Sequence, residues 1–148
     1  MELMKINEDV TVGAQPSAQR LKELAQNGFK TIVNFRTDGE DDQPISPADE
    51  GEKARQLGLE YLHVPVSMKS TKPETVDQFR QRYNQLPKPV FAHCKSGKRA
   101  GAMVMMHIAS EQGMTGKDTL EKAEQMGFKC EQPELREFVE QYVDKHRV

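Results

Sequence analysis

Short apolar runs alternate with helix-like stretches over the first two thirds of the chain. The runs fall at residues 6–12, 29–35, 59–66 and 90–92, and most of them contain β-branched side chains. Runs of this length and composition predict strands rather than helices. Because apolar and polar positions alternate only weakly in 6–12, we expect that strand at an edge of the sheet, whereas 90–92 should be buried.

Stretches with helical periodicity separate these runs and continue to the end of the chain. Their expected ranges are 18–26, 47–57, 73–85, 100–109, 115–126 and 133 onwards. Capping residues mark four of the helix starts, namely Ser17, Ser46, Thr71 and Thr115. Helices that alternate with strands pack on both faces of a parallel sheet. We therefore expect a three-layer α/β fold, in which helices flank a central, mostly parallel sheet of four or five strands.

The stretch from Pro89 to Met103 has the clearest chemical meaning. An apolar strand leads into Cys94, a polar loop with Gly97 and Arg99 follows, and an apolar helix comes next. Free amides at a helix N-terminus bind anions, and a glycine lets the loop curl so that its N–H groups share one centre. An arginine adds a planar fork that suits phosphate or sulfate oxygens. We therefore expect an oxyanion site at the carboxyl end of this strand.

A cysteine at such a site is expected to be a nucleophile. The amides and cations around it favour the thiolate, which attacks electrophiles that carry anionic oxygens. The loop residues expected to bind the substrate are His93, Lys95, Ser96, Gly97, Lys98 and Arg99. The alternative is an inert, buried cysteine near a helix start. Cys, Gly and Arg within six residues are a narrower signal than a lone cysteine, and they favour the functional interpretation.

Length and composition narrow the classes of function. A chain of 148 residues is most simply one domain, spanning residues 1–148. The net charge of −2 provides no overall basic field for nucleic acid or for an acidic membrane surface, and no apolar run is long enough to cross a bilayer. The N-terminus lacks the apolar segment of a signal peptide. Two cysteines make no disulfide framework, so we expect a reducing, cytoplasmic location.

The second cysteine and two of the histidines are each open to two interpretations. Cys130, near a turn between two helices, is either a small, partly buried side chain or a resolving thiol for oxidised Cys94. His107 lies within an apolar helix and is expected to be structural, whereas His63 belongs to a strand that points toward the same end of the sheet as Cys94. No spacing of Cys, His and carboxylates matches a metal site, so we expect neither a metal nor another cofactor.

A polar loop at residues 36–45 groups four carboxylates. They are Asp38, Glu40, Asp41 and Asp42. Such a cluster is either solvated surface or the source of a proton donor near Cys94. Arg36, at the end of the preceding strand, either reaches the site or pairs with these carboxylates.

Four segments of the chain share the pattern of one known family. Residues 93–101, His-Cys-Lys-Ser-Gly-Lys-Arg-Ala-Gly, carry the specific match, and residues 13–17, 29–36 and 61–66 support it. On these segments the chain resembles the cysteine-dependent protein phosphatase superfamily, in its dual-specificity-like branch. It looks most like the bacterial beta-lactamase-hydrolase-like phosphatase family. The resemblance covers most of the chain and implies a dual-specificity-phosphatase-like fold.

The resemblance implies a role for each matching residue. Cys94 is then the nucleophile that forms a phosphocysteine, and Arg99 holds the phosphate oxygens together with the amides of residues 95–99. His93 favours the thiolate through the hydrogen bonds of the loop rather than acting as a base. The implied substrate is a phosphorylated protein, such as one carrying phosphotyrosine, or a small aryl phosphate.

The loop departs from the phosphatase pattern at two points. Four residues separate Cys94 from Arg99, where the ordinary phosphatase loop has five, and four is the spacing common in rhodanese-type sulfurtransferases. Ala100 stands where a Ser or Thr usually eases departure of the thiolate from phosphocysteine. Hydrolysis is therefore expected to be slow unless Ser96 substitutes.

A third departure concerns the general acid. The resemblance implies an Asp after the strand that holds His63, but residues 66–71 contain no carboxylate. We expect the acidic loop to replace it, with Asp38 and Asp42 as the catalytic candidates and Glu40 or Asp41 as alternatives. An aryl phosphate has a good leaving group and needs a proton donor least.

Three functions remain open from the sequence. The first is a phosphatase, and the second is a rhodanese-like sulfurtransferase or persulfide-handling enzyme that uses the same cysteine loop. The third is a non-enzymatic module that binds anions or phosphoproteins, which the missing acid favours. The sequence pattern specifies no oligomeric state.

Overall fold

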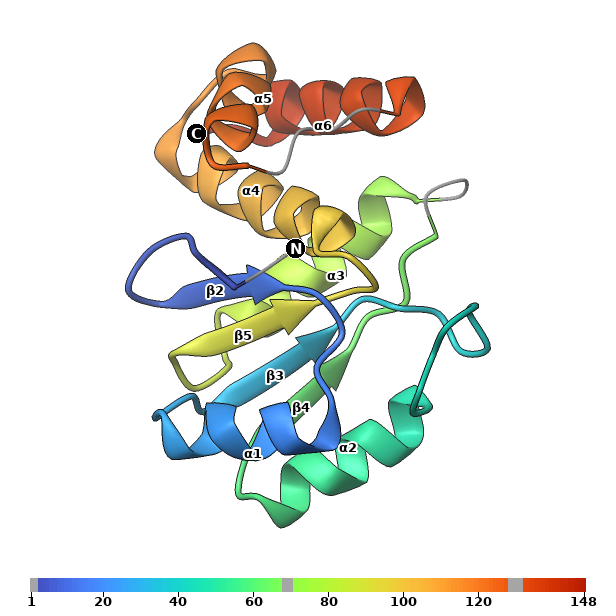
Figure 1. Cartoon of the computed structure of the whole chain (residues 1–148). Coiled ribbons are helices and arrows are strands. Elements are labelled where there is room, and N and C mark those ends of the chain that lie inside the picture. Colours follow the sequence, from blue (N-terminus) through green and yellow to red (C-terminus); the bar gives the residue numbers. More distant parts are fainter. Residues whose placement is uncertain (1–2, 68–70, 128–131) are drawn as a thin grey trace.

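The computed structural model describes residues 3–67, 71–127 and 132–148. Its centre is one five-stranded sheet in the order β1-β2-β5-β3-β4 (Figure 1). The strands are β1 (Met4–Lys5), β2 (Val10–Gly13), β3 (Thr31–Asn34), β4 (Glu60–His63) and β5 (Val90–His93). β1 is antiparallel to β2 and every other pair is parallel. This confirms the expected mostly parallel sheet of an α/β fold.

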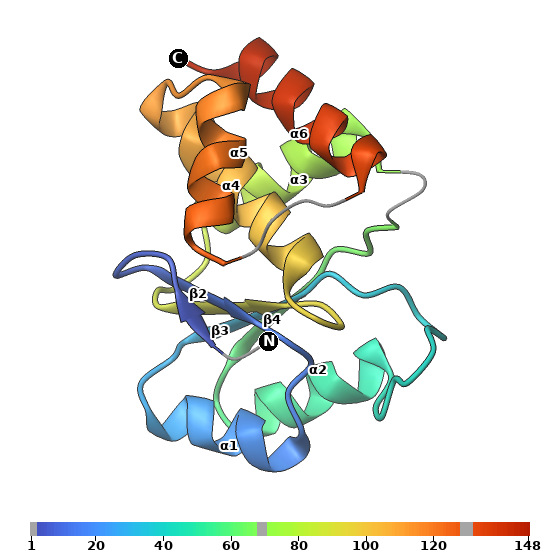
Figure 2. The ribbon, with the colours of Figure 1, turned by 45° about the horizontal axis from the view of Figure 1, so that its top comes forward.

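The helices form the two outer layers. They are α1 (Ala18–Gln26), α2 (Pro47–Gln56), α3 (Pro73–Tyr83), α4 (Lys98–Gln112), α5 (Gly116–Gln125) and α6 (Pro133–His146). In Figures 1 and 2, α1 and α2 cover one face of the sheet, and α3 and α4 cover the other. α5 and α6 pack against each other and against α4. The three-layer prediction is therefore confirmed.

The strand expected at residues 6–12 is wrong in its start and in its place. A turn occupies the first half of that range, because the side-chain oxygen of Asn7 accepts hydrogen bonds from the amides of Asp9 (2.8 Å) and Val10 (3.0 Å). The turn folds β1 back along β2, so β1 forms the sheet edge. β2 lies inside the sheet, between β1 and β5.

Three of the four predicted helix caps are confirmed. The hydroxyls of Ser17, Ser46 and Thr115 each accept a hydrogen bond from the amide three residues later. The cap predicted at Thr71 is wrong, because its hydroxyl donates to the carbonyl of Ser67 and α3 begins after Lys72.

α4 is the most deeply buried helix of the described chain segments. It begins at Lys98, two residues before the predicted start, and its residues from Ala100 to Met106 are buried. His107 of α4 faces α3, where its Nδ1 accepts a hydrogen bond from Arg80 Nε at 3.2 Å. Burial lowers the pKa of His107, which fits the expected structural role of a neutral ring.

The parallel pairing brings four strand ends to one level. His93 of β5 is in register with Gly13 of β2 and with Asn34 of β3, and Asn34 is in register with His63 of β4. The loops that follow these strands therefore start side by side at the carboxyl edge of the sheet (Figure 1). Within the described ranges, no helix has both the length and the apolar character needed to cross a bilayer.

Candidate active site

The loop between β5 and α4 directs backbone amides at the sulfur of Cys94. The Cys94 side chain is buried, with 1% of the residue exposed. Its Sγ accepts hydrogen bonds from the amide of Gly97 at 3.1 Å and from the amide of Ala100 at 3.5 Å. Gly97 has a φ of 99°, a left-handed conformation that favours glycine, and it caps the N-terminus of α4. The expected curl of this loop in front of the helix is therefore present.

Arg99 is held against this loop by a carboxylate from the acidic loop. Its Nη1 donates to Glu40 Oε2 at 2.7 Å and its Nη2 donates to Glu40 Oε1 at 2.8 Å, which makes a bidentate pair. Nη1 also donates to the carbonyl of Val66, after β4, at 2.9 Å. Glu40 raises the pKa of Arg99, and the nearby sulfur of Cys94 raises it further.

Glu40 has further donors within its own loop. Its Oε2 accepts from the amide of Thr37 at 2.6 Å and from the Thr37 hydroxyl at 2.9 Å, and its Oε1 accepts from Arg36 Nε at 3.0 Å. Arg99 is the main cause that holds the pKa of Glu40 well below its ordinary range. Glu40 is therefore an ionised carboxylate at neutral pH, and these contacts disfavour the earlier alternative that it donates a proton.

Arg36 joins the acidic loop to the interior of the molecule. The side chain is completely buried, and its Nη2 donates to the carbonyl of Asp41 at 2.8 Å while its Nη1 donates to Gln15 Oε1 at 3.0 Å. The sequence left open whether Arg36 reaches the site or pairs with the acidic loop. The pairing of Arg36 with the acidic loop is observed, at Glu40. Because Glu40 also pairs with Arg99, one carboxylate connects the two arginines.

A buried carboxylate lies behind the cysteine loop. Glu50 of α2 has no exposed side-chain surface, and its Oε2 lies 2.7 Å from Nε2 of His93, which is also fully buried. Gln15 donates from Nε2 to Glu50 Oε1 at 2.6 Å, and its main-chain amide donates to the carbonyl of Lys95 at 3.2 Å. The loop around Cys94 is therefore connected to α2 through polar contacts on the far side from α4.

Both ring nitrogens of His93 face acceptors. Nδ1 lies 3.2 Å from the carbonyl oxygen of Cys94, and Nε2 faces the Glu50 carboxyl group. A carbonyl oxygen only accepts, so this hydrogen bond needs a proton on Nδ1. The second contact needs one more proton between Nε2 and Oε2. These two contacts orient the His93 ring at the strand end that leads into Cys94.

Sequence reasoning missed Glu50 and Gln15. The only signal for Glu50 is its spacing, because it shares the inward face of α2 with Pro47 and Ala54 at helical intervals. A charged residue on such a face is a candidate for a buried pair. Gln15 lies in a segment that the resemblance already marked, but its residue type alone does not indicate a partner.

The two aspartates predicted as catalytic lie toward solvent. Asp38 is exposed in the turn that follows β3. Asp42 has 83% of its side chain exposed, and its Oδ2 lies 3.3 Å from Nζ of Lys95. Among the contacts of the described residues, Glu40 is the carboxylate of this loop that reaches Arg99. A proton-donor role for Asp38 or Asp42 thus stays a prediction, and the Asp42 carboxylate contacts the cysteine loop at Lys95.

The other residues predicted for the site differ in their exposure and in their contacts. Lys95, Ser96 and Lys98 are exposed. Ala100 is buried, and its amide rather than a side-chain hydroxyl faces Cys94. His63 binds the carbonyl of Arg36 through its Nε2, so it supports the acidic loop. Cys130, which the sequence left open as either a small, partly buried side chain or a resolving thiol, lies outside the described residues. Among the described residues, no group of three or more His, Cys, Asp or Glu side chains is placed to hold a metal ion.

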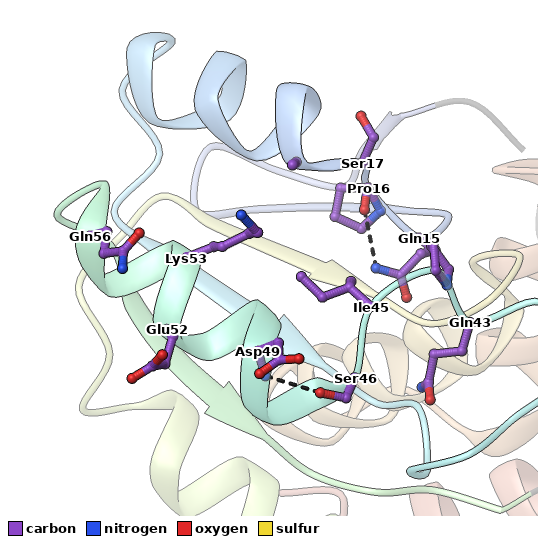
Figure 3. Close-up of a pocket in the computed structure, with 12 residues that line it drawn as sticks. Gln15, Pro16, Ser17, Gln43, Ile45, Ser46, Asp49, Glu52, Lys53 and Gln56 are labelled. Carbon is purple, nitrogen blue, oxygen red and sulfur yellow. Dashed lines mark hydrogen bonds between the residues drawn. The ribbon is translucent and has the colours of Figure 1, made fainter.

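A pocket of about 690 Å³ opens beside this loop, between α1 and α2. It is lined near the two helix starts by Ser17 and Ser46 and at its far side by Lys53, as Figure 3 shows. Gln15 contributes to its wall and also binds the main chain of Lys95. Gln15 therefore lines the pocket and also contacts the cysteine loop, whereas Cys94 is not among the residues that line the pocket.

Comparison with known proteins identifies the family. Residues 2–114 match the model described as "Beta-lactamase hydrolase-like protein, phosphatase-like domain". The chain belongs to this family. It is 33% identical over 130 residues to the beta-lactamase hydrolase-like protein of Agrobacterium fabrum, and 34% identical over 113 residues to that of Xylella fastidiosa Temecula1. These stretches are 86% and 75% of this chain but 30% and 25% of the relatives, so the chain spans under a third of their length.

Solved structures share the fold of this phosphatase-like domain. The structure of nma1982 from Neisseria meningitidis Z2491 has a TM-score of 0.80 and 26% identity, and covers 96% of this chain and 99% of its own. TpbA of P. aeruginosa has a TM-score of 0.78 and 24% identity, with 98% of this chain and 88% of TpbA covered. PTPMT1 has a TM-score of 0.74 and 16% identity, with 97% and 94% covered. The expected phosphatase-type fold is therefore confirmed.

Proposed function

We propose that this domain is a cysteine-dependent phosphatase that hydrolyses aryl phosphate monoesters, among them phosphotyrosine in proteins. The observation that carries the proposal is the position of the Cys94 sulfur at the start of α4. The sulfur accepts hydrogen bonds from two backbone amides and lies near the guanidinium of Arg99. Amides and a guanidinium that surround a sulfur stabilise both the thiolate and an oxyanion placed against it. Membership of a phosphatase-like family agrees with this chemistry.

The reaction has two displacement steps at phosphorus. The Cys94 thiolate attacks phosphorus, the P–O bond to the aryl group breaks, and the aryloxide leaves with the bonding electrons. Water then attacks phosphorus, the S–P bond breaks, and its electrons return to the sulfur. The proton lost by the water passes to the departing phosphate. Arg99 and the loop amides stabilise the charge on the phosphoryl oxygens in both steps.

The preference for an aryl leaving group follows from the acidic loop. Glu40 is ionised and paired with Arg99, while Asp42 is exposed and paired with Lys95. A leaving group that departs as a stable aryloxide needs no strong proton donor, whereas an alkoxide does. A crystal structure of TpbA contains pTyr, an aryl phosphate, in a protein of the same fold.

Hydrolysis of p-nitrophenyl phosphate by the purified protein tests this function. We expect nitrophenol and phosphate in equal amounts, and we expect Cys94→Ser to abolish both products. Cys130→Ser, which changes the other cysteine, is the matched control and should retain activity. An inactive wild-type protein, or a Cys94→Ser variant that still turns over, contradicts the proposal.

The spacing of the loop supports one second candidate, a sulfurtransferase. Four residues separate Cys94 from Arg99, and the same amides can face an anionic sulfur donor such as thiosulfate. Formation of thiocyanate from thiosulfate and cyanide, without phosphate release from aryl phosphates, would favour this second function over the first.

A further inference from the structure

We propose that the free edge of β4 is a docking site for the substrate protein. An extended segment that flanks the phosphorylated residue pairs with β4 as a further strand of the sheet, and the peptide then turns toward Cys94. The inference rests on the proposed function and adds a substrate class to it. That class is a protein whose phosphorylated residue lies in an extended, unfolded segment.

The main chain of β4 is paired on one side. The amides of Glu60 and Val64 each donate at 2.9 Å to a carbonyl of the β3 segment. Main-chain groups of a strand alternate between its two sides, so those of Tyr61 and His63 point away from β3. β4 is the last strand in the sheet order, and within the described part of the chain these outward groups have no main-chain partner. The edge therefore offers two N–H donors and two carbonyl acceptors to another strand.

A groove of about 620 Å³ follows this free edge. Its lining includes Tyr61, Leu62 and His63 of β4, several residues of α2, and Arg82 of α3. α2 and α3 cover opposite faces of the sheet, so they bound the groove on its two sides (Figure 2). An extended peptide fits such a groove, because its main chain faces the edge while its side chains point alternately toward the two helices.

The edge leads to the cysteine loop. The last residue of β4 is in register with Asn34, which is in register with His93, the residue before Cys94. The chain that leaves β4 also binds Arg99, through the carbonyl of Val66 at 2.9 Å. A strand added outside β4 lies three strand spacings from β5, which is about 14 Å. About four residues of extended chain span that distance, so one short peptide can occupy both the groove and the active site.

Charged side chains give the groove a direction. Arg55 lies near the end of α2 and Arg82 near the end of α3, and both are exposed. Each helix connects two parallel strands, so both helices end at the edge of the sheet that is far from Cys94. The lining also includes Asp49 and Glu52, which belong to earlier turns of α2. Acidic side chains of the peptide therefore fit the far end of the groove.

The first experiment measures kcat/KM of the wild type on p-nitrophenyl phosphate, on free phosphotyrosine and on a peptide. The peptide has about 15 residues, a central phosphotyrosine and glutamates at both ends. We expect it to exceed free phosphotyrosine at least about 10-fold, because each main-chain hydrogen bond contributes a factor of roughly 5 and ordering of the peptide offsets part of the gain. A matched peptide with lysines at both ends should be the poorer substrate.

N-methylation of single amides in the glutamate peptide tests the strand pairing itself and leaves the protein unchanged. In an added strand every second amide faces β4, and the others face away from it. Methylation at every second position of one flank should lower kcat/KM about 5-fold, because each such change removes one hydrogen bond. The intervening positions and the other flank should have little effect.

Arg82→Glu tests the charge at the far end of the groove. It should lower kcat/KM on the glutamate peptide about 5-fold relative to p-nitrophenyl phosphate, and it should remove the preference over the lysine peptide. Arg136→Glu, at an exposed position of α6, is the matched control and should keep that preference.

Three outcomes overturn the inference. Equal kcat/KM for the peptide and free phosphotyrosine, with p-nitrophenyl phosphate still hydrolysed, removes the docking site and leaves the proposed function standing. Methylation effects that do not alternate assign peptide binding to side chains instead of strand pairing. A wild-type dimer that Tyr61→Pro converts into a monomer assigns the edge to a second copy of the chain, because proline removes an outward donor but no bond to β3.

Amide hydrogen exchange covers an enzyme that does not turn over. If the wild type hydrolyses none of the substrates, the proposed function fails, and exchange tests the docking alone. Addition of the glutamate peptide should slow exchange at the amides of Tyr61 and His63, because pairing with an added strand protects them. Unchanged exchange at both amides overturns the docking site as well.

Discussion

Glu50 and His93 share a hydrogen bond of 2.7 Å, although 43 positions separate them in the chain and neither side chain has any exposed surface. The contact joins the interior face of α2 to the end of β5, one residue before Cys94. A buried pair of this kind is costly to break, because the partner that remains is an uncompensated polar group. The geometry of the cysteine loop therefore depends on a helix on the opposite face of the sheet from α4.

Replacement of Glu50 should destabilise the protein strongly. Glu50→Ala leaves the Nε2 of His93 without its partner and removes one of the two acceptors of Gln15 Nε2, and we expect a loss of about 3–5 kcal/mol in the free energy of unfolding. Urea unfolding measures it. Glu52→Ala, at an exposed position of the same helix, is the control and should change that free energy by less than about 0.5 kcal/mol. Equal effects of the two variants would contradict a structural role for the buried pair.

Gly97→Ala should separate strain in the loop from chemistry at the sulfur. Gly97 has a φ of 99°, so a side chain there costs roughly 1–3 kcal/mol and displaces the amide that faces Cys94. Gly28→Ala is a matched control, since Gly28 has a φ of 93° and open space around a new Cβ. We expect similar losses in melting temperature for both variants and a loss of phosphatase activity for Gly97→Ala alone. Full activity of Gly97→Ala would show that its amide is not needed.

Glu40 should give the stability of the fold a pH dependence of known sign. The Arg99 guanidinium is the main cause that lowers the pKa of Glu40 from its ordinary value of 4.5. Because the folded-state pKa is below the unfolded one, ionised Glu40 stabilises the protein above pH 4.5, and this contribution is lost as the pH falls further.

Urea unfolding of wild type and Glu40→Gln at neutral and acidic pH measures this contribution. The wild type should be the more stable protein at neutral pH, and the difference should shrink on acidification. Glu121→Gln, at an exposed position of α5, is the matched control and should follow the wild type throughout. A difference that stays constant with pH would mean that the ionised form of Glu40 adds nothing to the fold.

The local features of the cysteine loop could be predicted from the sequence. An apolar strand, Cys94, Gly97 and a following helix are consecutive in the chain, and each has a preferred conformation that neighbours do not override. The caps at Ser46 and Thr115 were predictable for the same reason. The start of β2 was not predicted, because the turn at Asn7 interrupts a run whose pattern alone indicates one strand.

The partners of the loop could not be predicted, because they come from distant segments. The acidic loop was recognised as a source of carboxylates, but four residues of similar type compete there, and only the fold selects Glu40 for Arg99. The same holds for Glu50, whose pairing with His93 depends on how α2 packs on the sheet. Local pattern therefore identifies the nucleophile loop, whereas tertiary packing decides which charges surround it.

Trapping of the covalent intermediate tests the central claim most directly. The wild-type protein is mixed with p-nitrophenyl phosphate, quenched in acid during turnover, and digested for mass spectrometry. We expect the peptide that contains Cys94 to gain the mass of one phosphoryl group, and we expect Cys94→Ser to show no such gain on that peptide. Steady turnover with an unmodified Cys94 peptide, or a phosphoryl group on another residue, would contradict the account.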